Sequence, residues 1–509
     1  MEQSIYQHTP LEDATPYLLI RGGVILAPHI PSGLLAQDIV ICEQRIHALG
    51  APGTLSLPHI PHREIAAEGC LVLPGFVNAH THSPENLLKA TMPSLPVEMW
   101  GIPFYGDFLP WTPQMTYLSV LWGAREMLKT GTTAVLDHLW TVDGVSREHL
   151  HAAMRAYRDS GLRATVAPFI EDQDLLLQAA RQHGLPLPSH PFTERFEQWS
   201  SLDEQVSILE EMLSTWHGSA AGRLQCMPGP VGIQWCSPAL MQRCLTLMDH
   251  YHTGLHLHAV ETQLQAQTLQ EQVGMGGISY LQRQGALGTR TSLAHAIWLE
   301  EGDLALLAQT QTTIVHNPIS NCRLGSGRFA LRDALQHGVP VALGSDGSAS
   351  NDTQNMFTVM KMTGLLHNQA QEAYQRWPQA AEIVTMATLG GATALGQAHE
   401  LGQIAPGYLA DLVLLNLDTQ PFLPLRDPLL HLVYGEVSSA VTTVIVDGQV
   451  IVEDGKIVTI DEEALQQEIR AISSTLWPGY QAYLDSLPTT RDVMQLFEQL
   501  YQKYQKPTI

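Results

Sequence analysis

Histidine is abundant in this chain, and its closely spaced pairs are the first candidates for chemistry. Of 509 residues, 23 are histidine, and His-x-His pairs stand at 80/82, 149/151, 250/252 and 256/258. Chance gives about one such pair, so the spacing alone is a weak signal. On a strand, residues i and i+2 point to the same side and can reach one metal ion, whereas on a helix they do not share a face. The pairs 149/151 and 250/252 lie in helix-like or loop segments, so we expect ordinary packing or surface residues there.

The other two pairs belong to a set of residues that end short apolar runs. His80 and His82 follow one such run, His256 and His258 end a second, and His295 and Asp346 end two more. Each residue alone would more often be structural. Together they would place neutral nitrogen donors and a carboxylate on one rim, which suits Zn²⁺ or Fe²⁺. The sequence therefore predicts a metal centre.

Eight apolar runs separated by helical spacers would position these residues. The runs cover 71–76, 132–137, 163–170, 230–235, 254–258, 291–295, 312–316 and 340–345. Such alternation predicts an α/β protein with a (β/α)₈ TIM-like barrel, in which active sites form at the C-terminal ends of the strands. An open doubly wound sheet is the alternative.

Composition and charge exclude several classes of protein. Lys and Arg number 27, Asp and Glu 50, and the net charge is −23, which repels phosphate backbones and anionic membranes. We expect no nucleic-acid or membrane partner, no membrane-spanning run of about 18 apolar residues and, from the N-terminal MEQSIYQHTPLEDATPY, no signal peptide. The six cysteines form no CxxC pair, which suits reduced thiols in a cytoplasmic protein.

Five segments, in chain order, resemble motifs of the amidohydrolase superfamily. Residues 74–82 (PGFVNAHTH) are similar to its first-strand motif, and residues 258–262 (HAVET) to its fifth-strand HxxE element. The sixth-, seventh- and eighth-strand motifs are matched by 292–295 (SLAH), 316–321 (HNPISN) and 343–347 (LGSDG). The likeness is strongest to the cytosine deaminase-like branch, which includes guanine deaminase, adenosylhomocysteine and methylthioadenosine deaminases, and triazine hydrolases.

The resemblance implies a domain organisation. Residues 404–413 are similar to the return of the chain into a small β-sandwich built from both ends, and strand-like segments at 17–20 and 443–448 agree with it. We expect the sandwich to comprise 1–74 and 396–460, the barrel 75–395, and a helical tail on the surface 461–509.

The resemblance also implies a role for each matching residue. One divalent ion, Zn²⁺ before Fe²⁺, would be bound, and its water would attack a ring carbon while a carboxyl protonates the neighbouring ring nitrogen. The ligands would be His80, His82, His258 and Asp346, and catalysis would use Glu261, His295 and Asp346. For Glu261, the alternative is a helix-start carboxylate that satisfies backbone N–H groups.

A negative observation favours a single ion. Binuclear members of the superfamily bridge two metals with a carboxylated lysine, usually from the fourth strand. No lysine stands between Lys129 and Lys361. This disfavours urease-, dihydroorotase- and hydantoinase-like chemistry.

The loop after the first strand contains a possible substrate element. Glu98 and Trp100 resemble the acidic-x-Trp element with which nucleoside-type deaminases hold a ribose, and packing of a lid is the alternative. Two departures weaken an adenosine-like interpretation. Val231 stands where those enzymes have a fourth-strand histidine, and the third-strand end, 167–172, lacks an arginine that some of them use.

Residues after the second and fourth strands indicate a different, aromatic-lined pocket. They are His138, Gln234 and Trp235. An indole face suits a flat heterocycle. His138 alternatively lies behind the substrate.

The leading hypothesis is a hydrolytic deaminase of a purine, pterin, pyrimidine or triazine, acting on carbon–nitrogen bonds other than peptide bonds. The alternative is a hydrolase of the same branch that expels an alkylamine or chloride. A non-catalytic scaffold is the third hypothesis, and it is disfavoured because such proteins usually lose metal ligands. The partner expected is a small heterocycle, and a homo-oligomer stays open.

Overall fold

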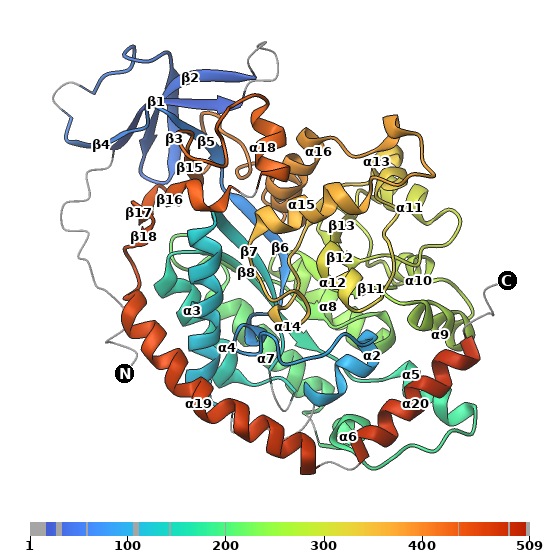
Figure 1. Cartoon of the computed structure of the whole chain (residues 1–509). Coiled ribbons are helices and arrows are strands. Elements are labelled where there is room, and N and C mark those ends of the chain that lie inside the picture. The colour runs from blue at the N-terminus through green and yellow to red at the C-terminus, as the bar shows by residue number, and fades with distance from the viewer. Residues whose placement is uncertain are drawn as a thin grey trace.

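The computed structural model describes residues 17–26, 33–57, 60–104, 111–141, 144–198, 200–435, 437–486 and 489–504. The sequence expectation of no signal peptide concerns residues 1–16, which lie outside this set. In the described part, helices and parallel strands alternate through the middle of the chain, and strands from both ends form a separate sheet (Figure 1). None of its helices is both long and apolar enough to span a membrane.

Parallel strands in two sheets form the centre of the molecule. The first sheet has the order β10-β8-β7-β6 with β9 beside β8, and the second has the order β11-β12-β13-β14. Their side chains are almost all buried, as expected where helices cover a parallel sheet. The strands are β6 (Phe76–Thr81), β7 (Thr132–Leu139), β8 (Arg163–Ile170), β9 (Leu224–Cys226), β10 (Gly229–Pro230), β11 (Leu255–Ala259), β12 (Thr291–His295), β13 (Thr313–His316) and β14 (Val341–Leu343).

The two parallel sheets approach each other on both sides. Gly232, just after β10, forms a parallel bridge with His258 of β11. On the other side, the backbone N–H of Asp346 donates to the carbonyl of His80 at 2.9 Å. The strands thus follow one another in chain order in a TIM-barrel-like arrangement, and the predicted α/β class is confirmed.

Two predicted strands differ from the observed ones. The run 71–76 is mostly β5 (Cys70–Pro74), which belongs to the other sheet, and the first barrel strand begins at Phe76. Between them lies Gly75, where a Cβ would stand 2.1 Å from the Thr133 hydroxyl, so only glycine fits the crossing. The run 230–235 begins at the second residue of the two-residue strand β10 and continues into a 3₁₀ turn, η3 (Ile233–Trp235).

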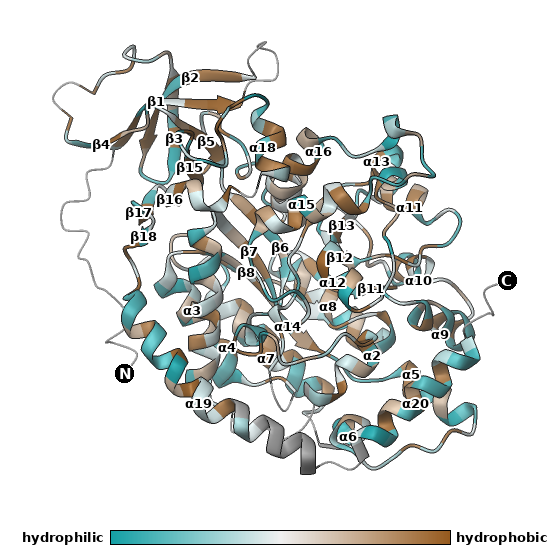
Figure 2. Cartoon of the chain, viewed as in Figure 1, coloured by the Kyte–Doolittle hydropathy of each residue, from teal (hydrophilic) through white to brown (hydrophobic). Residues whose placement is uncertain are grey.

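Helices cover the parallel strands, with apolar faces inward and polar faces outward (Figure 2). Polar residues begin many of them: Thr112, Ser201 and Ser237 each accept a hydrogen bond from the first turn. The longer helices are α3 (Pro113–Lys129), α4 (Arg147–Ser160), α5 (Leu175–Gln182), α6 (Pro191–Gln198), α7 (Leu202–Trp216), α8 (Pro238–His250), α9 (Gln263–Val273), α10 (Gly277–Gln284), α11 (Asp303–Thr310) and α15 (Met356–Leu366). The shorter ones are α2 (Val97–Trp100), α12 (Pro318–Arg323), α13 (Leu331–His337), α14 (Ser348–Asn351), α16 (Ala380–Thr385), α17 (Gly391–Ala394) and α18 (Pro428–Tyr434).

A nine-stranded mixed sheet joins the two ends of the chain. Its centre is the antiparallel pairing of β5 with β15, and Arg163 of β8 ties it to the parallel strands through buried ion pairs to Asp411 (2.9 Å) and Asp447 (2.7 Å). The other strands are β1 (Tyr17–Leu26), β2 (Leu34–Cys42), β3 (Arg45–Gly50), β4 (His62–Ala66), β15 (Leu412–Asn416), β16 (Val441–Val446), β17 (Gln449–Glu453) and β18 (Lys456–Ile457).

The C-terminal part of the chain is helical, with α19 (Glu462–Ser486) followed by α20 (Thr489–Tyr504). Contrary to expectation, α20 is not a surface appendage. Its apolar positions recur at helical spacing and are buried against α2, α5 and α9 (Figure 1). They are Val493, Leu496, Phe497 and Leu500, none more than 2% exposed.

Candidate active site

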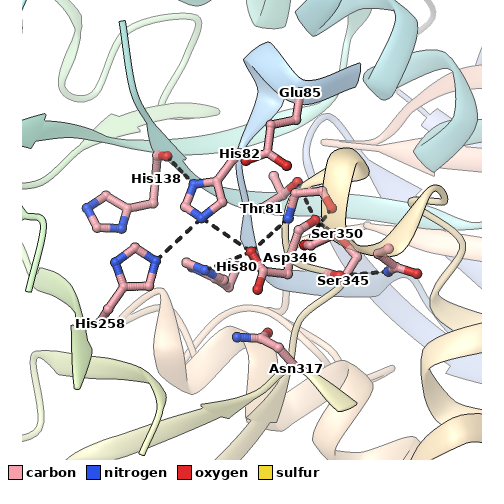
Figure 3. Close-up of polar contacts among 12 residues, drawn as sticks. His80, Thr81, His82, Glu85, His138, His258, Asn317, Ser345, Asp346 and Ser350 are labelled. Carbon is pink, nitrogen blue, oxygen red and sulfur yellow. Dashed lines mark hydrogen bonds and ion pairs between the residues drawn. The ribbon is translucent and has the colours of Figure 1, made fainter. Parts of the chain in front are cut away.

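Four of the predicted metal ligands converge at the C-terminal ends of the parallel strands (Figure 3). His80 lies in β6 and His82 directly follows it, His258 lies in β11, and Asp346 follows β14. The His80 and His82 Nε2 atoms stand 3.4 and 3.2 Å from Asp346 Oδ1. His258 Nε2 stands 3.4 Å from His82 Nε2. All four side chains are less than a tenth exposed.

Backbone carbonyls orient two of these imidazoles. His82 Nδ1 donates to the carbonyl of His138 at 2.7 Å, and His258 Nδ1 donates to that of Val231 at 2.6 Å. An N–H committed to a carbonyl leaves the opposite nitrogen with a free lone pair, the arrangement found around bound metal ions. Both Nε2 atoms therefore face the shared space, where each can offer its lone pair to a cation once it carries no proton.

A hydrogen-bonded chain behind His80 orients the third imidazole. His80 Nδ1 pairs with His256 Nε2 at 2.8 Å, and His256 Nδ1 pairs with the Ser292 hydroxyl at 2.7 Å. His80 Nε2 is fully buried and has no hydrogen-bond partner among the described residues. A buried nitrogen in this state needs a partner, and a cation between it and Asp346 would be one.

The donor set fits a divalent ion. His80, His82 and Asp346 offer ligand atoms within 4.8 Å of one another, and so do His80, His138 and His258. Burial lowers the pKa of His80 to about 4, so this imidazole is neutral at ordinary pH, as a ligand must be. Burial also lowers the pKa of His82, but the hydrogen bond and the negative charge of Asp346 outweigh it and raise this pKa to about 9. A bound cation would compete with the proton that the His82 imidazole then carries.

Asp346 is held in an unusual backbone conformation. Its φ is +63°, in the left-handed region that costs energy for a residue with a Cβ. Burial would raise the pKa of its carboxyl, but His80 and His82 hold that pKa well below its usual range. Asp346 is therefore an anion in the centre of the histidines.

Glu261 and His295 lie beside this group. His295 Nε2 stands 3.7 Å from Asp346 Oδ2, and its Nδ1 stands 2.8 Å from Asn321 Oδ1 and 3.9 Å from Glu261 Oε1. The Ser326 hydroxyl donates to Glu261 Oε1 at 2.7 Å. Burial raises the pKa of Glu261, so its carboxyl is more readily protonated than an exposed one.

A small cavity, here called the inner cavity, opens beside these residues. Its volume is about 120 Å³, and His82, His258 and Glu261 line one side of it. The rest of the lining is formed mainly by aromatic and aliphatic side chains: Val97, Phe169, Leu176, Phe192, Val231, Trp235 and Phe497. A reacting atom placed next to the histidines would therefore belong to a molecule with an apolar body.

The residues predicted to bind substrate divide into two groups. Glu98 and Trp235 line the inner cavity. Trp100 packs instead in a separate apolar cluster with Leu88, Met92 and Trp111.

His138 and Gln234 do not line the inner cavity, and both are fully buried. His138 lies among the histidines with its ring 4.1 Å from that of Phe169, and His138 Nε2 stands 3.2 Å from the carbonyl of Gly229. Figure 3 shows His138 beside His82 and His258.

Several residues at the cavity escaped the sequence analysis. Phe169 ends a strand that was recognised, and its position at the strand end was a usable signal. Phe192 and Phe497 lie on α6 and α20, far along the chain from the strand ends, and no motif marked them. His149, in one of the dismissed His-x-His pairs, is a packing residue bonded to Thr116 at 2.7 Å.

Comparison with known proteins identifies the family of the chain. The Amidohydrolase family matches residues 71–451. A 5-methylthioadenosine/S-adenosylhomocysteine deaminase of Syntrophomonas wolfei is 31% identical over 87% of this chain and 94% of its own, and a 5'-deoxyadenosine deaminase of Methanothermobacter thermautotrophicus is 32% identical over 90% and 98%. The structure of an atrazine chlorohydrolase from Arthrobacter aurescens, complexed with zinc, is similar at a TM-score of 0.79 and 25% identity, covering 90% of this chain and all of that one. The predicted resemblance is confirmed, and the chain belongs to the amidohydrolase family.

Proposed function

We propose that this protein is a metal-dependent hydrolase that removes the amino group of an aminated heterocycle of purine, pterin, pyrimidine or triazine type. The observation that carries the proposal is the convergence of His80, His82 and Asp346, with His258 beside them, next to the buried carboxyl of Glu261. The names of the deaminase relatives support it.

One divalent ion would be held by His80, His82, His258 and Asp346. Such an ion supplies Lewis acidity and makes a water molecule acidic enough to lose a proton near neutral pH. We propose Zn²⁺ before Fe²⁺, because imidazole and carboxylate donors suit zinc and the chlorohydrolase structure contains it. The lysine-free segment between Lys129 and Lys361 supports a single ion.

The remaining polar residues move protons and orient the substrate. Asp346 takes the proton of the attacking water. Glu261 protonates the ring nitrogen next to the attacked carbon, so that negative charge does not build up on the ring. The proton held by Asp346 then passes to the amino group, which leaves as ammonia, while the added hydroxyl returns a proton to Glu261. His295, fixed by Asn321, donates a hydrogen bond to the oxygen that adds to the carbon.

The finer architecture is also a proposal. The parallel strands close into a (β/α)₈ barrel over 75–395, supported by the contacts between β10 and β11 and between β14 and β6. The nine-stranded sheet forms a β-sandwich from 1–74 and 396–460, followed by the helical part 461–509.

We propose a cytoplasmic location, a small-molecule partner and no nucleic-acid partner, supported by six free cysteines and the charge of −23.

Ammonia release tests the reaction. Protein of measured zinc and iron content is incubated with a panel of aminated heterocycles, and ammonia, alkylamine and chloride are assayed in parallel. We expect ammonia from one chemical class, in proportion to bound metal. Alkylamine or chloride instead would support the alternative leaving groups, for which the chlorohydrolase neighbour is the reason. No product from fully metallated protein would favour a non-catalytic scaffold.

A further inference from the structure

The helix α20 brings a tyrosine hydroxyl to the carboxylate of Glu98. Tyr501 donates to Glu98 Oε2, and Glu98 Oε1 accepts from the Thr262 hydroxyl at 2.5 Å and from Gln265 Nε2 at 3.2 Å. A carboxylate accepts about four hydrogen bonds, so most of this capacity is used inside the protein. Glu98 is only 5% exposed, and burial raises its pKa. It has little left to offer a ligand.

This cluster, Glu98, Thr262 and Tyr501, stands between two cavities. The inner cavity is lined by Glu98, Glu261 and Phe497, and a second cavity of about 580 Å³ is lined by Met99, Thr262 and Tyr501. No residue lines both cavities, but α2, the segment 261–263 and α20 contribute to each. The cluster therefore forms a partition between them.

The helix that supplies this partition is firmly attached. Its apolar residues are buried in a cluster shared with α2, α5 and α9. At its C-terminal end, Tyr504 donates to Glu271 and stands 3.1 Å from His183 Nε2, and near its start Thr490 stands 3.2 Å from His190 Nε2. The partition is a fixed wall of the inner cavity.

The inner cavity is too small and too apolar for a sugar. Sites for drug-sized ligands span roughly 300–1,000 Å³, against about 120 Å³ here. The apolar part of the lining includes Phe169, Phe192 and Phe497. A hydroxylated group placed there would lose its hydrogen bonds to water without replacement, a large cost.

We propose that Tyr501 and Phe497 determine specificity: they close the inner cavity and occupy Glu98, so that the substrate is a compact, sugar-free aminated ring with at most small apolar substituents. This inference rests on the proposed function and adds the substrate class. Ribosylated analogues are rejected because Glu98 is not available to their hydroxyls and because Phe497 fills the space they need.

The experiment uses metallated full-length protein and two variants. Tyr501→Phe removes the donor to Glu98 Oε2, and Phe497→Leu shortens the wall while keeping it apolar. Tyr504→Phe is the matched control, since it removes a hydroxyl from the same helix and Tyr504 lines neither cavity. The readout is the ratio of kcat/KM on sugar-free rings (adenine, aminotriazines) to that on adenosine and 5'-methylthioadenosine.

We expect the wild-type ratio to favour sugar-free rings by at least about 10-fold, since a site that leaves polar groups unpaired discriminates strongly. Tyr501→Phe shifts the ratio towards the ribosylated compounds by about 10-fold, Phe497→Leu shifts it in the same direction, and Tyr504→Phe leaves it unchanged. A general loss of stability would lower both kcat/KM values together without moving the ratio. A wild type that prefers ribosylated compounds, or a ratio unmoved by Tyr501→Phe, overturns the inference while the deaminase function stands.

A binding measurement separates the two proposals. If metallated protein releases no ammonia from any ring, the proposed function fails. Equilibrium dialysis of adenine and adenosine against wild type and Tyr501→Phe still decides the inference, because it needs no turnover. The inference is supported if wild type binds adenine more tightly than adenosine and if this preference is smaller in Tyr501→Phe. It is contradicted if the ratio of the two Kd values is the same in both proteins.

Discussion

The two sides of the inner cavity have different origins. The reactive side, formed by His82, His258 and Glu261 together with the adjacent His80 and Asp346, comes from strand ends and the turns that follow them. The distal side comes from helices and loops, among them Phe192 of α6 and Phe497 of α20. The reactive side is polar and held by backbone carbonyls, whereas the distal side is held by apolar packing. The distal side can therefore admit a different substrate while the reactive side keeps the same chemistry.

The largest effect is expected where the reactive side is broken. His82→Ala removes a ligand and leaves Asp346 without its partner at 3.2 Å, so metal content should fall by most of one equivalent and kcat/KM by more than about 10³-fold. Elemental analysis and the ammonia assay measure the two. His252→Ala, from an exposed His-x-His pair, is the control. Full metal retention in His82→Ala would contradict the ligand assignment.

Glu261→Gln separates proton transfer from metal binding. The variant keeps the shape of the side chain but cannot carry the proton, so kcat should fall by about 10²- to 10⁴-fold with metal content unchanged. Glu301→Gln, an exposed carboxyl, should leave both unchanged. Near-normal turnover by Glu261→Gln would remove this residue from the mechanism.

The distal side should show its own pH dependence. Burial raises the pKa of Glu171 to about 7, against the opposing effect of Arg195, whose guanidinium packs on the Phe192 ring. The folded chain then keeps a proton that the unfolded chain releases above about pH 4.3, so the free energy of unfolding falls as pH rises towards 7. Glu171→Gln removes this slope.

The stability of Glu171→Gln relative to wild type should therefore grow between about pH 4 and 7 by on the order of 3 kcal/mol. Urea unfolding at several pH values measures it, with metal content held constant and Glu301→Gln as the control. Parallel pH profiles for variant and wild type would show that Glu171 is ionised throughout this range.

The smallest effect concerns the hydrogen bond that orients Glu261. Ser326→Ala removes a donor at 2.7 Å, and since one such bond contributes about 1 kcal/mol, kcat should fall by up to about 10-fold with KM little changed. Steady-state kinetics checks this, with Ser474→Ala, on the exposed face of α19, as the control. An effect as large as that of Glu261→Gln would mean that Ser326 itself takes part in the reaction.

Much of the fold was predictable because local patterns carried it. The strands at 163–170 and 291–295 have the predicted bounds, because a short apolar run between two helical patterns favours a buried strand. The length of the fourth strand was overestimated, because Pro230 supplies no N–H and the chain turns at Gly232. The run 71–76 was assigned to the barrel because apolarity does not show which sheet a strand joins.

The sequence by itself determined the reactive side, because residues that end consecutive parallel strands must meet at one rim, whatever the helices between them do. Only the tertiary structure decided the distal side. Tyr501 reaches Glu98 across 403 residues of chain, and Trp100, two residues from Glu98, turns into a separate cluster. Such contacts depend on how a helix docks, and docking follows from the summed burial of many apolar side chains, which carries no local motif.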